Sequence, residues 1–430
     1  MNRTKVSCTL FCLSILLSCN STVSIQNETV PVIDLASEIG KGRVVNLSEV
    51  ASDIRYVQLE TSDSSLIGMY PRVFYENERI YVLSVRVVKV FDKNGKFLFK
   101  FDRRGRGAQE YQSGSIRVMS NTGDFMVQTN APFESVNLIF YDREGRYIKR
   151  ATIPYQKYTF QDRTIEINNN LFVTSASPKY KDSVKLCAIV YDSLFNIQKE
   201  IPMPYISENA MESGGERIFI SSDSGPKPPS NIMFSINSPQ LYRYDESVRL
   251  VTSENDTIFS IDSKMNYSPA FSINYGKFKN EPPKKDVVTV LEGDFISLRP
   301  GYYIESRNSL ILNFYLRNFA HEPYERTVVN RQGTRVQKYA DCYALFDKKS
   351  GELTLLNQPV KSKLGFREDI MDGPVFLPTH ISGDFYATAL FSAAEIIEHA
   401  ETNNVKGELK NMISNLKDSD NPVVAIVKLK

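Results

Sequence analysis

The chain has 430 residues, of which 42% are hydrophobic and 24% are charged, a balance typical of globular proteins. Its 25 Phe and 23 Tyr exclude an intrinsically disordered chain, and a formal net charge of +2 gives no bias toward nucleic acid or an anionic membrane surface. Phe, Tyr, Val and Ile suit strands, and long amphipathic helical patterns are scarce before residue 390. A mostly β protein is therefore expected.

Residues 1–19, MNRTKVSCTLFCLSILLSC, have the pattern of an export signal. Two basic residues precede an apolar run, Leu10–Leu17, that is too short to span a bilayer. The run leads into Leu-Leu-Ser-Cys, which resembles the lipobox of bacterial lipoproteins, although Leu17 is bulkier than usual at its position. We predict that Cys19 is lipidated, with an ordinary cleaved signal peptide as the alternative. Stable anchoring takes more than one acyl chain, such as palmitate.

Asn20 follows this cysteine, so the aspartate that resembles an inner-membrane retention signal is missing. The expected location is therefore the cell envelope, at the outer membrane, with the lipid on Cys19 as the membrane contact. Residues 20–42 begin with a polar stretch and are predicted to be a tether. Residues 43–430 are predicted to form one folded unit.

Five segments share one pattern, in which an apolar run ends in an aspartate and a polar turn leads to a second strand. The aspartates are spaced by 50, 50, 70 and 85 residues and are Asp92, Asp142, Asp192, Asp262 and Asp347. An Asp carboxylate accepts backbone N–H bonds in a turn, and a glycine three or four residues later in three copies supplies positive φ. These aspartates are therefore predicted to form turns, not to catalyse. Runs that are apolar on both faces, with a period near 50, indicate sheets packed around a ring, as in a β-propeller.

The segment before each hairpin is predicted to supply the two inner strands of a blade. These strands are expected at 71–75 and 79–85 in blade 1, 115–119 and 124–129 in blade 2, 164–167 and 171–176 in blade 3, and 302–305 and 309–315 in blade 5. Blade 4, roughly 215–275, is less regular, and blade 5 contains a long excursion over 317–338.

The C-terminal part predicts a sixth blade, with inner strands at 376–381 and 384–390 and a third strand at 422–430. Between them, 393–416 carries the apolar stripe of a helical insert. We assign the missing outer strand to Ile54–Glu60, because pairing the two ends of the chain closes the ring and removes open sheet edges. The predicted fold is an all-β, six-bladed β-propeller whose N- and C-terminal strands close the ring, with a short helical insert in the last blade.

Two cysteines lie outside the leader, Cys187 and Cys342, each five residues before a turn aspartate. They occupy equivalent places in blades 3 and 5. A disulfide needs Cα atoms within about 7 Å, and an intervening sheet of about 10 Å separates these two. Two buried free thiols are therefore predicted.

The stretch FDKNGKFLFKFDRRGRGAQEY follows IRYVQLETSDSSLIG and precedes a strand pair ending in GDFMVQ. It is similar to the six-bladed β-propeller lipoproteins common in Bacteroidetes, which are related in pattern to NHL repeats. The resemblance covers essentially the whole chain after the leader and is most specific over residues 54–111. It implies a propeller fold and an envelope location, but it does not indicate a reaction. This chain departs from NHL-like loops at Ala108 and Gln109, where a glycine or proline is favoured after RGRG.

No motif identifies a reaction. The run Arg103–Gly107, RRGRG, could bind phosphate or nucleic acid, but no helix follows it, and an inter-blade loop is the simpler interpretation. The three His lack metal spacing, and HExxH, CxxC and GxSxG are missing from the sequence, so no metal, cofactor or catalytic residue is predicted. Four carboxylates could support glycan chemistry, but their spacing selects no pair: Asp162, Glu166, Asp369 and Asp372.

Polar residues on the presumed innermost strands are the candidate ligand contacts. These are Arg72, Arg117 and His380, and such a cluster would suit an anionic ligand. The expected function is a lipid-anchored, non-catalytic scaffold that binds a ligand or an envelope protein. The alternative is a propeller enzyme acting on a glycan, as a lyase or hydrolase, and a third possibility is a structural subunit of an envelope complex. Nucleic acid is not an expected partner.

Overall fold

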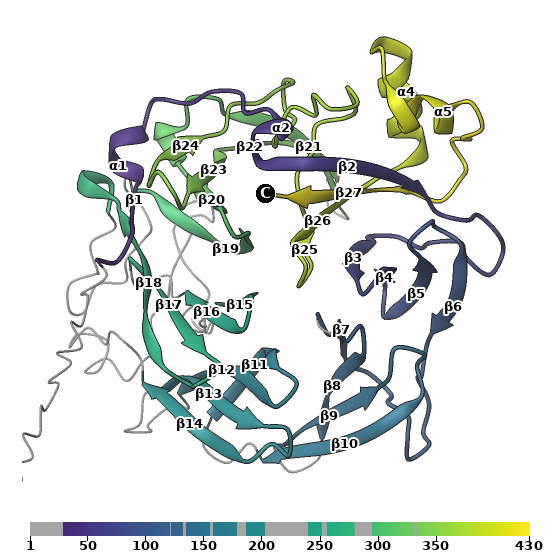
Figure 1. The fold of residues 1–430 in the computed structure, drawn as a ribbon, viewed down its shortest axis with the longest axis vertical. Coiled ribbons are helices and arrows are strands. Elements are labelled where there is room, and N and C mark those ends of the chain that lie inside the picture. The colour runs from purple at the N-terminus through teal and green to yellow at the C-terminus, as the bar shows by residue number, and fades with distance from the viewer. Residues whose placement is uncertain are drawn as a thin grey trace, which may run out of the picture.

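The computed structural model describes residues 29–120, 122–131, 135–154, 158–178, 186–202, 240–251, 256–279, 295–330 and 333–430. Within these residues the strands form six main sheets arranged around a central axis (Figure 1). Each sheet is antiparallel from its innermost to its fourth strand. The predicted six-bladed β-propeller is therefore confirmed.

The first three blades follow the chain from the inside outward. Blade 1 contains β3 (Arg72–Glu76), β4 (Arg79–Ser84), β5 (Val87–Asp92) and β6 (Phe97–Phe101). Blade 2 contains β7 (Ser115–Val118), β8 (Phe125–Ala131), β9 (Ser135–Tyr141) and β10 (Tyr147–Pro154). Blade 3 contains β11 (Tyr158–Asn168), β12 (Leu171–Pro178), β13 (Leu186–Asp192) and β14 (Ile197–Pro202). The inner strands expected for these blades are present, with shifted ends.

The next two blades carry the irregular segments. Blade 4 contains β15 (Gln240–Tyr244), β16 (Ser247–Val251), β17 (Thr257–Asp262) and β18 (Tyr267–Asn274), followed by the 3-10 turn η1 (Gly276–Phe278). Blade 5 contains β19 (Ser297–Glu305), β20 (Ser309–Tyr315), β23 (Asp341–Asp347) and β24 (Leu353–Leu355). The excursion predicted in blade 5 is η2 (Arg317–Phe319) and a separate hairpin, β21 (Tyr324–Asn330) and β22 (Gly333–Tyr339).

Blade 6 joins both ends of the folded chain. It contains β25 (His380–Ile381), β26 (Tyr386–Phe391), β27 (Val423–Leu429) and the N-terminal strand β2 (Ala51–Gln58) as its outer strand. The antiparallel pairing of β2 with β27 runs from Ala51 opposite Leu429 to Gln58 opposite Val423, which confirms the predicted ring closure. The first inner strand is shorter than expected, because Pro378 has no N–H for a ladder and Phe376 pairs with Phe366 instead.

The repeated aspartates form turns, as predicted. Asp92 Oδ1 accepts the N–H groups of Asn94 and Lys96, each at 2.9 Å, and the same bonds recur at the aspartates of blades 2, 3 and 4. In blade 1 the turn also needs positive φ at Gly95, which has φ of 86°. At Gly95 a Cβ would lie 2.1 Å from the Gln58 carbonyl oxygen of blade 6, so the glycine also permits close packing against the closing strand.

The core lies between the blades. In the described part of the chain there are six clusters of buried hydrophobic residues, one for each pair of neighbouring blades. Alternate residues of one strand enter different clusters, because successive side chains of a strand point to opposite faces. In β27, Val423, Ala425 and Val427 face blade 5, whereas Val424 and Ile426 face blade 1. This explains the runs that are apolar on both faces.

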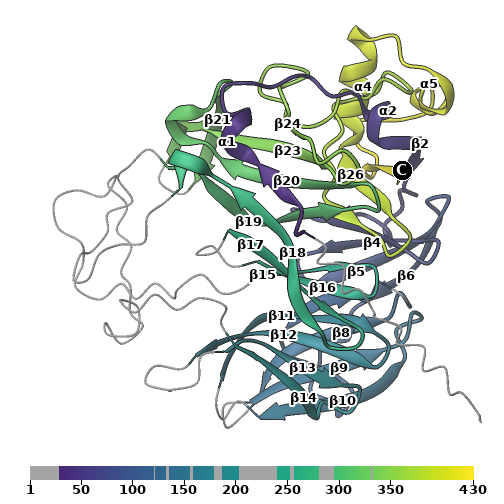
Figure 2. The same ribbon diagram turned by 60° about the vertical axis from the view of Figure 1, so that its left-hand side comes forward.

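An N-terminal strap, residues 32–50, holds three blades from outside and was not predicted. It begins with β1 (Val32–Asp34), which pairs in parallel with β18 as a fifth strand of blade 4. It continues through α1 (Leu35–Glu38), pairs Arg43 with Leu356 beside blade 5, and reaches β2 through α2 (Leu47–Val50) (Figures 1 and 2). The predicted tether of 20–42 was therefore wrong from Val32 onward, because that part is paired with the ring.

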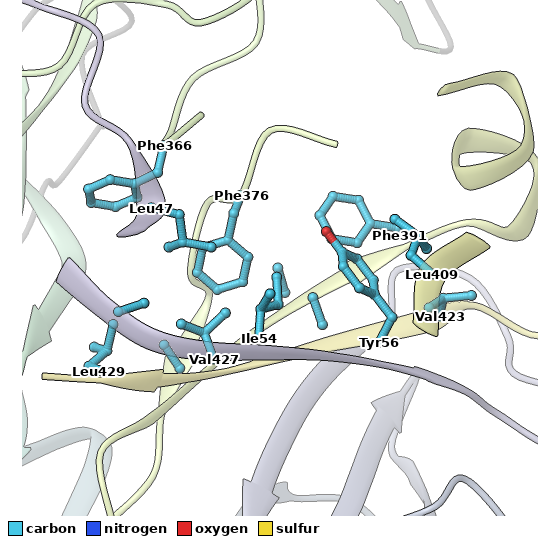
Figure 3. Packing of buried hydrophobic residues seen from close by; sticks show 14 of the residues in the cluster. Leu47, Ile54, Tyr56, Phe366, Phe376, Phe391, Leu409, Val423, Val427 and Leu429 are labelled. Carbon is cyan, nitrogen blue, oxygen red and sulfur yellow. The ribbon is translucent and has the colours of Figure 1, made fainter. Parts of the chain in front are cut away.

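The predicted helical insert lies between β26 and β27 and consists of α4 (Ala393–Thr402) and α5 (Gly407–Ile413). Ser392 caps α4 by accepting the N–H of Glu395 at 3.1 Å. Leu409 of α5 belongs to the same buried cluster as Phe391 and Tyr56 of blade 6 (Figure 3). The insert therefore packs against the closing blade.

Candidate functional site

The innermost strands β3, β7, β11, β15, β19 and β25 surround the ring axis and run in the same direction, because each blade begins at its innermost strand (Figure 1). They all end at one face, where a short turn leads to the second strand; we call this the turn face. The opposite face carries the connections from second to third strands and between blades, and we call it the loop face. The β21–β22 hairpin and the α4–α5 insert are such connections.

A buried acid–imidazole pair lies at the turn-face end of the axis. His380 Nε2 of blade 6 is 3.0 Å from Glu76 Oε1, and Glu76 is the last residue of β3 in blade 1. The Gly383 N–H donates to the other carboxyl oxygen at 3.3 Å, and the Phe74 ring meets the imidazole edge-on. Glu76 is only 2% exposed, whereas the His380 side chain is 19% exposed. The imidazole therefore covers the carboxyl group.

Burial shifts both groups toward their neutral forms. It raises the pKa of Glu76 well above its usual range; the Gly383 N–H and Arg243 oppose this rise, and Glu166 adds to it. Burial and, to a smaller extent, the nearby Arg117 lower the pKa of His380 to about 3. Between these limits the pair holds one proton and has no net charge, whichever of the two groups carries the proton.

Three more polar side chains from other blades reach the same region. Glu166 of β11 is 3% exposed and accepts the Ser120 N–H at 2.6 Å. Arg117 of β7 and Arg243 of β15 are partly exposed and act electrostatically on His380 and Glu76, respectively. The Arg243 Nε and Nη1 atoms are buried and have no hydrogen-bond partner among the described residues. Blades 1, 2, 3, 4 and 6 thus contribute to one axial polar cluster, defined as Glu76, Arg117, Glu166, Arg243 and His380.

Aromatic side chains meet beside this cluster at the turn face. Tyr244, which follows Arg243, lies 6.1 Å between ring centroids from Phe385 of blade 6. The Arg307 guanidinium of blade 5 lies over the same Phe385 ring at 5.1 Å. Phe385 is 8% exposed and has φ of 62°, a left-handed conformation that is uncommon for an aromatic residue. All three side chains belong to turn-face ends of their blades, at or after the ends of β15, β19 and β25.

Two of the three predicted ligand residues come together. Arg117 and His380 belong to the axial polar cluster, but Arg72 does not. Arg72 is the first residue of β3 and is exposed at the loop-face end, roughly 13 Å along the strand from Glu76. The predicted lipidation site, Cys19, lies outside the described residues.

Of the carboxylates considered for glycan chemistry, three have described side chains, and Glu166 is the only one of these three in the cluster. Asp369 accepts hydrogen bonds from Ser48 of the strap, and Asp372 pairs with Lys406 of the insert. The side chain of Asp162 lies outside the described residues. Glu76 and Arg243 were missed by sequence reasoning. The signal that could have found them is their position, because each is a charged residue at or next to the end of an innermost strand.

A second buried charge cluster stabilises the boundary between blades 4 and 5. Glu305, the last residue of β19, accepts from Arg249 Nε at 3.0 Å and from Arg249 Nη2 at 2.9 Å. Lys348 Nζ lies 2.8 Å from the same carboxylate, and burial lowers its pKa. The side chains are 0%, 12% and 16% exposed for Glu305, Arg249 and Lys348, respectively. Every charge is paired, so this arrangement is structural.

A cavity of only about 10 Å³ lies at the loop-face end of blade 5 and includes His321 and Cys342 in its lining. His321 Nε2 is 2.5 Å from Asn357 Oδ1. Cys342 is a buried free thiol, as predicted, whereas the side chain of Cys187 in β13 lies outside the described residues. Among the described residues no group of three or more His, Cys, Asp or Glu is arranged to hold a metal ion.

Comparison with known proteins bears on the family and the fold. The family model described as "Domain of unknown function (DUF4934)" matches residues 30–428. The chain belongs to this family. A search of curated proteins finds no match. Within the described residues, no helix has the length and apolar character needed to cross a membrane.

Three solved structures resemble the DUF4934 chain at low sequence identity. An exported protein of Bacteroides fragilis has 16% identity and a TM-score of 0.58, covering 93% of this chain and 99% of its own. A member of the DUF4221 family from Bacteroides vulgatus has 11% identity and a TM-score of 0.45, covering 89% and 97%. Virginiamycin B lyase from Staphylococcus aureus has 8% identity and a TM-score of 0.36, covering 87% and 99%. The B. fragilis likeness supports the propeller fold.

Proposed function

We propose that this DUF4934 protein is a non-catalytic binding scaffold of the cell envelope, anchored by lipid at Cys19, which takes a ligand with an anionic group at the axial polar cluster. The observation that carries the proposal is the pair of buried Arg243 donors, Nε and Nη1, for which the described chain supplies no acceptor. Buried donors in proteins are nearly always satisfied, so an acceptor from outside the chain is expected here.

The charge balance of the cluster favours an anion. With one proton, the Glu76–His380 pair is neutral, so it does not neutralise the nearby Arg243 guanidinium. Arg117, Arg243 and His380 are partly exposed, whereas Glu76 and Glu166 are buried. Guanidinium groups pair strongly with carboxylate and phosphate oxygens. The ligand is therefore a molecule with a carboxylate, phosphate or similar anionic group.

The same burial argues against the glycan enzyme. A glycosidase needs one carboxyl group to protonate the leaving oxygen and another to act on the sugar or on water. Glu76 and Glu166 are 2% and 3% exposed, and each already accepts a hydrogen bond from a backbone N–H group. Neither carboxyl group is presented to a substrate, so binding without cleavage accounts better for the arrangement.

Calorimetric titration of the purified protein with inorganic phosphate, citrate and trigalacturonate tests the ligand. At least one of these anions is expected to bind, and Arg243→Gln is expected to weaken that binding by about tenfold or more. Arg72→Gln is the matched control, because it removes the same charge from an exposed position at the other end of β3. Binding of none of the three anions, or equal losses in the two variants, would contradict the proposal.

Membrane fractionation of cells tests the anchor separately. The wild-type protein is expected in the membrane fraction, and Cys19→Ala is expected to release it, because only a thiol at that position can form the thioether with diacylglycerol. Cys342→Ala is the control, since that thiol is buried in blade 5. Retention of the Cys19→Ala protein on membranes would contradict lipid anchoring. It would not contradict anion binding at the axial polar cluster.

A further inference from the structure

Three innermost strands carry an aromatic side chain at the same position. Phe74 of β3, Tyr242 of β15 and Tyr303 of β19 each lie two residues before the last residue of their strand. Successive side chains of a strand point to opposite faces, so each aromatic ring is on the same face as that last residue. In blade 1 the last residue is Glu76 of the axial polar cluster, roughly 7 Å along the strand from Phe74.

Two of these aromatic rings stack on each other, but the third does not. The ring centroids of Tyr242 and Tyr303, in the neighbouring blades 4 and 5, are 4.9 Å apart and their planes differ by 14°. Both residues are buried. Phe74 is partly exposed, and in the described part of the chain no ring is stacked on it. It packs toward blade 2, whose innermost strand supplies the aliphatic Ile116 in place of a ring.

Phe74 borders the central axis of the propeller. Val73 and Tyr75 of β3 pack against blade 6, so the side chains of Phe74 and Glu76 are on the opposite face of the strand, toward blade 2. His380 belongs to blade 6, yet its ring centroid is 4.9 Å from that of Phe74 and its Nε2 atom is 3.0 Å from Glu76 Oε1. One edge of β3 is paired with β4. The imidazole therefore reaches both side chains past the other edge, at the axis.

The polar groups beside Phe74 are those of the axial polar cluster. Arg117 acts electrostatically on the same imidazole, and Arg243 acts on Glu76. Arg243 also has two buried donors without a partner among the described residues. Since only roughly 7 Å of strand separates Phe74 from Glu76, one small molecule can reach the cluster and the Phe74 ring together.

We infer that the ligand of the axial polar cluster is an aromatic anion, with its anionic group at Arg243 and its ring stacked on Phe74. The inference rests on the proposed function and narrows the ligand from anions in general to those with an aromatic ring, such as an aryl carboxylate. The ligand ring takes the place that the second tyrosine has in the stack of blades 4 and 5. Stacked aromatic pairs gain free energy beyond apolar burial, so an aromatic ring adds affinity that a saturated ring of similar size does not.

Competition binding with carboxylates tests this inference. Indole-3-acetate is the probe, because the protein has no tryptophan and the anisotropy of indole fluorescence therefore reports the ligand alone. Phenylacetate is expected to displace the probe at about five- to tenfold lower concentration than cyclohexylacetate, which has the same carboxylate on a saturated ring. Phe74→Leu is expected to reduce this preference to about twofold or less. Arg243→Gln is expected to weaken the binding of both competitors.

Phe99→Leu is the matched control, because Phe99 packs on the same buried cluster as Phe74 but belongs to the outer strand β6. It is expected to keep the wild-type preference for phenylacetate, and an equal loss of preference in this variant would overturn the inference. Equal binding of phenylacetate and cyclohexylacetate, or a full preference in Phe74→Leu, would also overturn it.

The inference and the proposed function fail in different ways. If phosphate, citrate or trigalacturonate binds and the three ring-bearing carboxylates do not, the inference is overturned and the proposed function stands. If none of these six anions binds, both are overturned.

Discussion

Replacing Glu76 with glutamine removes the titration of Glu76 and leaves that of its partner, His380, at the ring axis. In the folded protein the pKa of Glu76 is raised and that of His380 is lowered to about 3, from ordinary values of 4.5 and 6.5. The raised Glu76 pKa stabilises the fold below about pH 4.5, and this contribution is lost as pH rises through the folded pKa. The lowered His380 pKa does the opposite, because stability present above about pH 6.5 is lost as pH falls toward 3.

The magnitude follows from the number of protons bound in each state. Above pH 4.5 the unfolded chain loses the Glu76 proton that the folded protein keeps, and below pH 6.5 the unfolded chain gains a His380 proton that the folded protein lacks. Within this interval the two effects oppose each other in the wild type. In Glu76→Gln only the His380 effect remains, and a difference of one proton changes stability by about 1.4 kcal/mol per pH unit. The variant should therefore lose up to about 2–3 kcal/mol more than the wild type between pH 6.5 and 4.5.

Urea denaturation followed by circular dichroism, at several pH values between 4.5 and 7, measures this difference. Glu398→Gln, at an exposed position of α4, is the control and should follow the wild-type profile. A difference between wild type and Glu76→Gln that stays constant with pH would refute the reasoning. It would mean that the acid–imidazole pair does not retain a proton in the folded protein.

Three further predictions concern the scaffold. Glu305→Gln leaves two buried cations unpaired and should destabilise the fold by about 3–5 kcal/mol in urea denaturation. Glu395→Gln, which removes an exposed ion pair with Lys363, is the control and should change stability by less than about 1 kcal/mol. Leu35→Ala, at a fully buried position of the strap, should lower the free energy of unfolding by about 2–5 kcal/mol; a change below that of an exposed substitution would mean that the strap does not pack on the ring. In a Cys187→Ser background, Cys342 should react with a thiol reagent only after the protein unfolds, because the thiol is buried and its pKa is raised to about 12. Rapid labelling of the native protein would contradict this prediction.

The sequence predicted those parts of the fold that local patterns encode. An aspartate that ends an apolar run, as Asp92 does, forms its turn with its own neighbours, so the repeat could be read without knowing the ring. The closing strand could be assigned because an open blade lacks one strand. The strap strand β1 could not, because three residues carry no pattern and their parallel partner in β18 lies some 240 positions along the chain. Nothing local distinguishes such a strand from a tether.

The residues of the axial polar cluster could also be predicted only in part from local sequence patterns. Arg117 and His380 were found because polar residues on innermost strands were sought, but that rule also selected Arg72, which lies at the opposite end of its strand. The missing information was the direction of each strand relative to the faces. Once that direction is known, only residues near the end of an innermost strand can reach the cluster, and Glu76 and Arg243 meet this condition.

Position alone still does not determine the role of such a residue. Glu76 and Glu305 both end an innermost strand and are both buried. Two cations held by blades 4 and 5 neutralise Glu305, and this makes it part of the structure. The partner of Glu76 is an imidazole from blade 6, which leaves the pair titratable, and the nearby Arg243 has two buried donors with no partner among the described residues. The partner of Glu76 comes from the adjacent blade 6, 304 positions away, and Arg249, one of the two partners of Glu305, comes from the adjacent blade 4, so the difference between the two glutamates arises only when the ring closes.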